Sequence, residues 1–344
     1  MKPRRAIPTV IYNSVDIQEV LNDRLESFSY VDEASGSSDT ISISLDNKDK
    51  KWLNEWYPEK GDKITAYINK KNWAKEGDNS QFLCGVFLLD DFDLSGRPLT
   101  INLKGISSPR DEGFASTKRS KVWEKVTLRK IATEVASRSG LKLEYDAVEI
   151  NIKTIEQNEQ TDSEFLKKLC ETYGLAMKTY SNKIIIYDVI AYDKKDTVVT
   201  IDETDMIDWS FNSTLTGTYT GGKMQYTDAE TGEDYIVTVG SGTRLLEVNE
   251  KADSRDDALK QITSKVNLAN RGESTMSITI MANSDIAASS NVEITGLGKA
   301  NGKYSVEKVT HDLGSNYTMK LELKSVGGTI DGTKFSINKS GKDK

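Results

Sequence analysis

The 344-residue sequence contains only one histidine, His311, and two cysteines, Cys84 and Cys170. A zinc site built on histidines, or a Ser-His-Asp triad, would depend wholly on His311, which we expect to be structural. Each cysteine lies in an apolar pattern, so two buried thiols are expected rather than a disulfide framework. Neither a G-x-S-x-G nor a Walker A motif occurs. We therefore expect no enzymatic activity, no metal and no cofactor.

The sequence also lacks long apolar runs and strongly basic segments. No apolar run approaches the roughly 18 residues of a membrane span, and the N-terminus has no apolar signal-peptide core. Residues 1–109 carry 14 basic and 17 acidic side chains, residues 110–195 carry 16 and 14, and residues 196–344 carry 16 and 22. None of these segments is basic enough to neutralise many phosphates. We expect neither membrane insertion nor specific nucleic-acid binding.

Short strands dominate residues 1–109. Ile41, Ile43 and Leu45 alternate with serines, which is the period of a half-buried strand. Similar apolar patterns follow, separated by polar and glycine-containing segments, and one short helix is predicted over residues 48–56. Regularly spaced strands with a single helix indicate a small β-barrel or sandwich domain.

Residues 110–195 differ, because two helices with strong capping signals appear. The first is predicted over residues 127–140, and the second, over residues 161–174, begins with a T-x-x-E capping box at Thr161. One strand separates the helices, and a β-hairpin follows the second helix. The order αβαββ predicts a compact α+β domain.

Residues 196–327 return to strands. A hairpin is predicted around residues 229–232, a helix over residues 254–272, and a cleanly alternating strand over residues 317–324. Residues 328–344 are polar and are expected to form a loose tail. The first and third zones share a strand-rich plan, but no residue-level repeat links them.

Two segments together resemble a known family. Residues 161–174, TDSEFLKKLCETYG, match the pattern (S/T)-D-x-x-F-L-x-x-L-x-x-x-x-G. Near the other end, Gly302–His311 and Tyr317–Leu323 match G-x-Y-x-V-x-x-V-x-H and Y-x-x-x-L-x-L. In this order the segments resemble the phage late control protein D family, which includes the tail hub proteins of contractile phages and the hub part of VgrG spikes.

The resemblance implies a structural role and a mostly β, α+β fold. It implies two tube-like β domains, residues 1–109 and 196–327, flanking the inserted α+β module. Three copies would present six similar units in a ring, joining a hexameric tail tube to a trimeric central spike. The implied partners are the tail tube and spike proteins, with baseplate wedge and tape-measure proteins as further candidates. The expected location is the bacterial cytoplasm during assembly and then the tail tip of a released virion or phage-tail-like particle.

Two other functions remain open from the sequence. One is a tail-associated peptidoglycan hydrolase or peptidase, which the missing catalytic constellation disfavours. The other is the hub portion of a type VI secretion spike. A VgrG chain would continue into a neck and a repetitive spike, so we expect the spike to be a separate polypeptide.

The candidate interface residues are three tryptophans and two arginines near the N-terminus. Trp52 and Trp56 are spaced to share one face of the predicted short helix, and Trp73 follows a strand. Core packing within the first β domain is one interpretation, and an anchor at a subunit interface is the other, since tryptophan is enriched in interface hot spots. The basic start at Arg4 and Arg5 is either a solvated terminus or a dock for an acidic neighbour.

Acidic residues also gather in two places that could suggest a cation site. They are Asp90, Asp91 and Asp93 in the first zone and Asp202, Asp205 and Asp208 in the third. Neither group has the glycine and distal glutamate of an EF-hand loop. We expect solvated strand ends rather than a metal or an acid–base pair.

Overall fold

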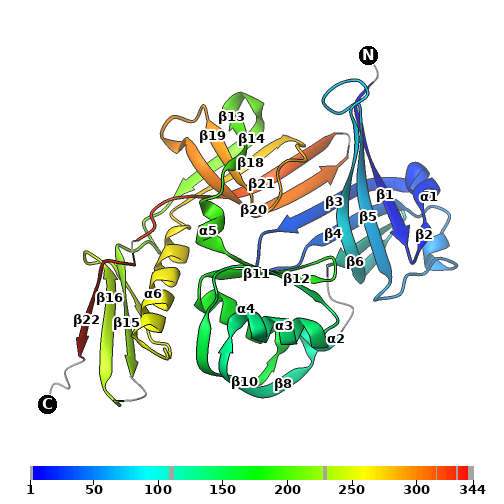
Figure 1. Cartoon of the computed structure of the whole chain (residues 1–344). Helices are drawn as coiled ribbons and strands as arrows, with labels where there is room; N and C mark the ends of the chain where they lie inside the picture. Colours follow the sequence, from blue (N-terminus) through cyan, green and yellow to red (C-terminus); the bar gives the residue numbers. More distant parts are fainter. Residues whose placement is uncertain (1–2, 108–111, 228–230, 315, 331, 340–344) are drawn as a thin grey trace.

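The computed structural model describes residues 3–107, 112–227, 231–314, 316–330 and 332–339. Strands account for about 51% of the chain and helices for about 19%. Figure 1 shows a large curved sheet, a compact α+β module beneath it, and a small helix-and-sheet unit beside the C-terminus. The predicted fold class, a mostly β, α+β protein, is confirmed.

The first half of the large sheet comes from the N-terminal zone. Its elements are β1 (Arg5–Tyr12), β2 (Val15–Asp16), α1 (Gln18–Arg24), β3 (Leu25–Glu33), β4 (Thr40–Asp46), η1 (Lys51–Leu53), β5 (Lys63–Lys71), β6 (Asn79–Ser95) and β7 (Thr100–Ile106). The alternation predicted in β4 is confirmed, because Ile41, Ile43 and Leu45 are all buried. The helix predicted over residues 48–56 is wrong, since only the single 3-10 turn η1 forms. The Asn47 side chain accepts a hydrogen bond from the Trp52 backbone N–H, and such local acceptors compete with helix formation.

The α+β module contains two small sheets and their covering helices. Its elements are α2 (Glu112–Ser116), β8 (Lys118–Thr127), α3 (Leu128–Arg138), β9 (Lys142–Asp146), β10 (Asn151–Thr161), α4 (Asp162–Thr172), β11 (Leu175–Tyr180), β12 (Lys183–Asp188) and α5 (Val189–Asp193). The predicted capping box is confirmed: Thr161 accepts from the Glu164 backbone N–H, and Glu164 accepts from that of Thr161. Gly174 ends α4 with φ 73°. Sheet β11-β12-β9 and helices α3 and α4 enclose a separate core.

The sequence missed the antiparallel ribbon β8–β10. Most side chains of β8 are exposed, so the apolar alternation that reveals a half-buried strand is absent there. Trp123 of β8 is an exception, because its ring stacks on Phe165 of α4 with centroids 5.1 Å apart. The ribbon therefore attaches to the module through a few apolar contacts.

The second half of the large sheet comes from the third zone. Its elements are β13 (Thr197–Asp202), η2 (Glu203–Asp205), β14 (Met206–Ser213), β18 (Ser274–Met281), β19 (Asn291–Thr295), η3 (Gly298–Ala300), β20 (Gly302–Leu313) and β21 (Tyr317–Ser325). Strand β20 is shared between partners: residues 302–305 pair with β19, and residues 308–313 pair with β3 of the first half. Both halves consequently contribute to one sheet and one hydrophobic core.

The remaining strands of the third zone form the small unit. Its elements are β15 (Gly221–Thr227), β16 (Asp234–Gly240), β17 (Leu245–Val248), α6 (Arg255–Asn270) and β22 (Phe335–Lys339). The predicted β15–β16 hairpin and the Ser254 helix cap are confirmed, while positions 229 and 230 of the predicted turn lie outside the described residues. The expectation of a loose tail over residues 328–344 is wrong for β22, which pairs with β16. Ile337 of β22 supplies the reason, because it packs against the apolar cluster under α6.

The two halves of the large sheet repeat one strand arrangement. The order β3-β4-β7-β6-β5 in the first half corresponds to β14-β18-β21-β20-β19 in the second. Corresponding strands also follow one another in the same order along the chain. Register shifts between paired strands occur at corresponding positions. The β6–β7 register shifts between Leu89 and Asp91, and the β20–β21 register shifts between Val306 and Lys308. We call these five-strand sets the first and second repeats.

Backbone details support the same correspondence. Gly85 of β6 has φ 140° and Gly302 of β20 has φ 141°, a conformation that side chains disfavour. Leu89 exchanges two 2.8 Å backbone hydrogen bonds with residues 61 and 62, and Val306 does the same with residues 289 and 290. Matched core positions are apolar but several differ in residue type, for example Ile41 and Met276, so the correspondence is hard to detect in the sequence.

The predicted domain boundaries at residues 109/110, 195/196 and 327/328 remain predictions. The shared sheet joins the first and third zones, and the small unit divides the third zone into two sheets.

Candidate assembly surfaces

The clearest unpartnered apolar surface lies on β14, an edge strand of the large sheet. In the part of the chain that the structure describes, β14 pairs only with β18. Ile207, Trp209 and Phe211 alternate along it and are 58%, 42% and 39% exposed. Trp209 and Phe211 lie opposite the buried Ile278 and Met276, so they share the core-facing side of the sheet. An apolar edge of this kind is a template for pairing with another chain.

A groove runs beside this edge. It measures about 450 Å³ and is lined by residues of β14, β18, β20 and β21, among them Phe211, Met276, Leu323 and Lys324. This edge was not predicted from the sequence, although Ile207, Trp209 and Phe211 alternate with Asp208 and Ser210. That period of two was the available signal.

A second open edge belongs to the distal half of β6. Residues 91–95 pair with β7 on one side, whereas β5 pairs with β6 only as far as Leu88. Phe92 and Leu94 are half-buried against the common core, and they lie opposite the buried Leu103 and Ile101. This edge therefore also presents apolar side chains on the core-facing side.

Trp52 and Trp56 lie together near η1, although no regular helix holds them. Their rings meet edge to face at 5.7 Å, and Trp52 is buried while Trp56 is half-buried. Arg24 and Lys51 lie over the Trp56 ring at 5.5 and 4.6 Å. Trp52 thus belongs to the core of the first half, and the role of Trp56 at an interface stays a prediction.

Trp73 joins the two halves of the sheet within one chain. Its indole N–H donates to the Ala282 carbonyl oxygen at 2.8 Å, and its ring packs on Tyr317 at 5.3 Å. Arg4 is exposed and lies 5.5 Å from the same ring, whereas Arg5 is exposed at the start of β1. The five candidates thus form two pairs, Trp52 with Trp56 and Arg4 with Trp73, with Arg5 beside the second pair.

His311, which was expected to be structural, lies inside β20. It is 2% exposed, and its ring stacks on Tyr30 and Phe82 at 5.3 and 5.4 Å. Its Nδ1 shares a 2.8 Å hydrogen bond with the Tyr317 hydroxyl. Burial lowers the pKa of His311 to about 4, so the imidazole is neutral at pH 7. The surroundings are those of a core residue at the β20–β3 junction.

The residues of the two acidic groups are exposed, except Asp202, which is half-buried. Lys104 lies 3.4 Å from Asp91 and 3.6 Å from Asp93 on the outer face of β6 and β7. Asp202 caps η2 by accepting from the Thr204 backbone N–H. Among the described residues, no group of three His, Cys, Asp or Glu side chains is arranged to hold a metal.

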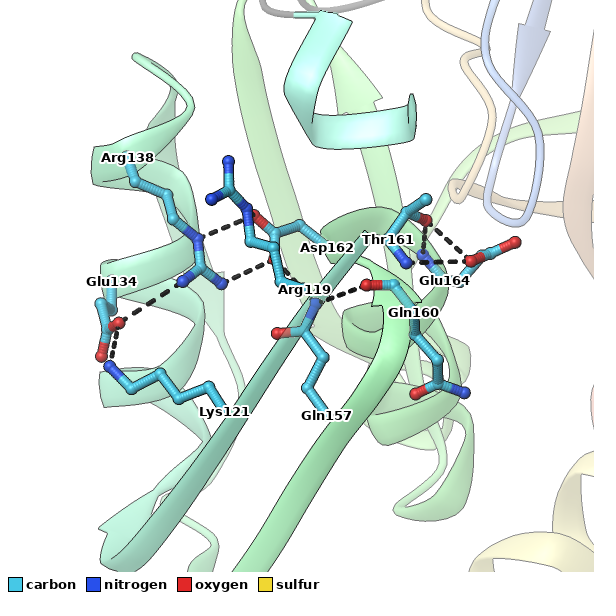
Figure 2. Close-up of polar contacts among 9 residues, drawn as sticks. All are labelled: Arg119, Lys121, Glu134, Arg138, Gln157, Gln160, Thr161, Asp162 and Glu164. Atoms are coloured by element: carbon cyan, nitrogen blue, oxygen red, sulfur yellow. Dashed lines mark hydrogen bonds and ion pairs between the residues drawn. The ribbon is translucent and has the colours of Figure 1, made fainter. Parts of the chain in front are cut away.

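Asp162, at the start of α4, is a fully buried carboxylate. Figure 2 shows Arg138 and Gln157 directed at it. Arg138 donates to both carboxylate oxygens at 2.7 and 2.6 Å, Gln157 donates at 3.0 Å, and Arg119 lies 3.3 Å away. Both oxygens are engaged by donors that hold the module together, so the arrangement is structural rather than catalytic.

A buried ionic cluster fastens the module to the large sheet. Lys178 of β11 pairs with Asp32 of β3 and, at 3.0 Å, with Asp39. Asp32 also accepts from the Ala288 backbone N–H at 2.8 Å, and Asp39 from that of Glu33 at 3.0 Å. Burial raises the pKa of Asp39 to about 6, although the charge of Lys178 opposes the shift. This cluster links three segments that are distant in sequence.

A second buried cluster lies where the small unit meets the module and the sheet. Arg271, just after α6, donates to Asp193 at 2.8 and 3.0 Å and to Glu307 of β20 at 2.8 Å. Ser264 of α6 also donates to the Tyr173 carbonyl oxygen at 3.2 Å. Buried arginine–carboxylate pairs with such geometry fix relative orientation, and losing one partner leaves an unpaired charge.

The cysteines are free and buried, as predicted. Burial raises the pKa of both thiols, so neither is poised for nucleophilic chemistry. In the described part of the chain, no helix is long and apolar enough to cross a membrane.

Comparisons with known proteins agree with this architecture. The fold is that of phage tail proteins. The 43 kDa tail protein of prophage MuSo2 from Shewanella oneidensis superposes with a TM-score of 0.72 at 11% identity, covering 95% of this chain and 100% of that chain. A tail protein from Neisseria meningitidis MC58 gives 0.71 at 10% identity, covering 94% and 98%. The E. coli c3393 protein, a component of the type VI secretion system, gives 0.54 at 9% identity, covering 89% and 74%.

Two sequence relatives carry a more specific name. The chain is 27% identical over 219 residues to the probable baseplate hub protein of Escherichia phage P2, covering 62% of this chain and 54% of that protein. It is 24% identical over 177 residues to the probable baseplate hub protein of Escherichia phage 186, covering 50% and 42%. The match thus spans about half the length of these relatives, and no protein-family model matches the sequence. The resemblance to baseplate hub proteins read from the sequence is confirmed.

Proposed function

We propose that this chain is a structural baseplate hub that joins the tail tube to the central spike of a contractile phage tail or phage-tail-like particle. The proposal depends on the agreement between the sequence comparison and the fold comparison. Relatives named baseplate hub proteins match the sequence, and a phage tail fold spans 95% of the chain. In this proposal the chain is a homotrimer, so that two repeats per copy present six similar units toward a hexameric tube.

The open edges support an assembled state. The β14 edge and the distal β6 edge both expose apolar side chains on the core-facing side of the sheet. An obligate ring interface typically buries more than about 2,000 Å². The continuous sheet and the buried ionic clusters around Lys178 and Arg271 are consistent with a protein that transmits axial load. The two clusters hold the α+β module and the small unit against the large sheet.

The site chemistry supports a role without catalysis. His311 is buried and neutral, and Asp162 is saturated by donors. No observation favours the hydrolase or peptidase alternative. The partners in this proposal are the tail tube and spike proteins, with wedge and tape-measure proteins adjacent. The chain would assemble in the bacterial cytoplasm and remain at the tail tip of the released particle.

The test is a cryo-EM reconstruction of tail particles from the producing strain. We expect three copies of this chain in a ring between the last tube layer and the spike. A ring of six copies, a lone copy, or absence from the tail tip would contradict the proposal. Genes for a tail tube and a sheath beside this one would favour a tail over a secretion spike. A zymogram with the purified chain tests the hydrolase alternative, and we expect no clearing.

A further inference from the structure

The internal repeat contains one completed junction and the two parts of an uncompleted one. Within the chain, the edge strand of the first repeat, β3, pairs with the distal half of β20 from the second repeat. The matching edge strand of the second repeat is β14, and the matching segment of the first repeat is the distal half of β6. In the described residues both of these edges are open. The β20–β3 pairing thus shows how the β14 edge could pair with the distal half of β6, a contact that a single copy does not make.

The completed junction defines the register of that pairing. His311 lies opposite Tyr30, and Leu313 lies opposite Phe28, in antiparallel pairing. The two aromatic side chains of β3 are consequently 1% and 2% exposed. Pairing with β20 is therefore what covers the edge of the first repeat.

The strand registers within each repeat identify which residues of the second repeat correspond to those at the β20–β3 junction. Tyr30 faces Ile41 in β4 just as Phe211 faces the corresponding Met276 in β18, so Phe211 is the counterpart of Tyr30. Counting from the matched bulges at Leu89 and Val306, Leu94 is the counterpart of His311. By the same steps Trp209 corresponds to Phe28, and Gly96 to Leu313.

We propose that β14 of one copy pairs antiparallel with residues 91–95 of β6 in the next copy, with Phe211 opposite Leu94. The junction between copies thereby repeats the β20–β3 junction within each copy. This inference rests on the proposed function and names the strands, the register and the partner, which is a second copy of this chain.

The chemistry of the two edges fits this register. Leu94 and Phe211 both lie on the core-facing side of their sheets, so pairing brings apolar faces together. On the outer side, the register places Asp91 opposite Thr214 and Asp93 opposite Asn212. No carboxylate faces another, so the contact creates no like-charge repulsion across the strands.

The contact is heterologous, because β14 of one copy meets β6 of its neighbour. Such head-to-tail contacts either close into a ring or extend without limit. Six strands separate β14 from β6 in the sheet order of one chain, so a bond between them reports a contact between copies.

The experiment is disulfide trapping in assembled tail particles with the variant L94C/F211C. Directly opposed residues of an antiparallel pair have Cα atoms about 4.5–5.5 Å apart, within the range of a disulfide. Cys84 and Cys170 are buried and do not compete. Mild oxidation followed by non-reducing electrophoresis should give bands of one, two and three linked chains and nothing larger. The matched control D93C/F211C places the two thiols on opposite faces and should give at least tenfold less product.

Each outcome decides the inference. A product of three linked chains from L94C/F211C, with at least tenfold less product from D93C/F211C, supports the inference. Equal products from both variants, or a ring of three copies that L94C/F211C leaves unlinked, overturns the junction while the hub proposal stands. A chain absent from the tail tip overturns the proposed function, and the junction between copies with it. Leu94 and Phe211 are not fully buried, so we expect the cysteine substitutions to leave the fold intact. Equal thermal unfolding of the variant and the wild type would confirm this.

Discussion

The two repeats of this chain have the same strand order and differ in what covers their edges. In the first, β20 covers β3, and Phe28 and Tyr30 are 1% and 2% exposed. In the second, nothing in the described chain covers β14, and the corresponding Trp209 and Phe211 are 42% and 39% exposed. The comparison teaches that identical topology does not fix burial at an edge strand. What lies beyond the edge decides whether an aromatic residue belongs to a core or to an interface.

The repeats also differ in what is inserted between their first two strands. Residues 34–39 connect β3 to β4, and Asp39 in this connection meets Lys178 of the module. Between β14 and β18 the chain instead builds β15, β16, β17 and α6, and Arg271 at its end meets Asp193 and Glu307. Each repeat therefore uses the same connection to fasten a different body through a buried ion pair.

The largest expected difference is between matched aromatic truncations. Phe28→Ala should lower the free energy of unfolding by about 3–5 kcal/mol, because it leaves a cavity in a closed core. The counterpart Trp209→Ala should cost less than about 1 kcal/mol in the isolated chain, since the side chain is already partly solvated. Urea unfolding followed by circular dichroism measures both. Equal losses would show that the edges are equivalent in the isolated chain.

A second prediction uses His311, which stacks at the completed junction and has the non-titrating Leu94 as its counterpart. Its folded pKa, about 4, lies below the usual 6.5, so the unfolded chain takes up the proton first as pH falls. Between pH 6.5 and 4 this should remove about 3 kcal/mol of stability. His311→Gln should cost about 1–2 kcal/mol at pH 7 from the lost hydrogen bond, abolish this slope, and produce no enzymatic phenotype. Melting temperatures across pH 4–7 provide the measurement, and an unchanged slope would contradict the assignment.

A third prediction concerns Asp39 in the connection that follows β3. Its folded pKa, about 6, lies above the usual 3.8, so the folded chain takes up this proton first. The contribution of Asp39 to stability should therefore rise by about 2–3 kcal/mol as pH falls from 6 to 4, opposite in sign to that of His311. Asp39→Asn should remove that gain. If the difference in melting temperature between wild type and variant does not change over this range, Asp39 is not the titrating group.

The smallest expected effect on stability should accompany a large effect on assembly. Phe211→Asp on the open edge should change the free energy of unfolding by less than about 1 kcal/mol in the isolated chain. It should also prevent ring formation, because pairing would bury an unpaired charge. Mass measurement of tail tips, or complementation of a deletion, reports assembly. Val15→Asp is the matched control, since Val15 is an exposed apolar residue elsewhere on the sheet, and it should assemble normally.

Much of the local structure was predictable from the sequence. The capping box at Thr161, the stop at Gly174, and the strand carrying Ile41 and Ile43 appear where the patterns place them. These features depend on residues a few positions apart, so short-range hydrogen bonds and periodicity suffice to specify them. The family resemblance also came from such local segments.

By itself, then, the sequence determined the three longest helices, α3, α4 and α6, many of the strands and the structural class of the protein. Only the tertiary structure decided which strands became neighbours: β20 beside β3, β22 beside β16, and Trp73 against a carbonyl 209 residues away. It also decided that Trp52 is a core residue while Trp209 is exposed. The physical reason is that strand pairing and burial depend on contacts between distant segments. A period of two tells which side chains share a face, but not what covers that face.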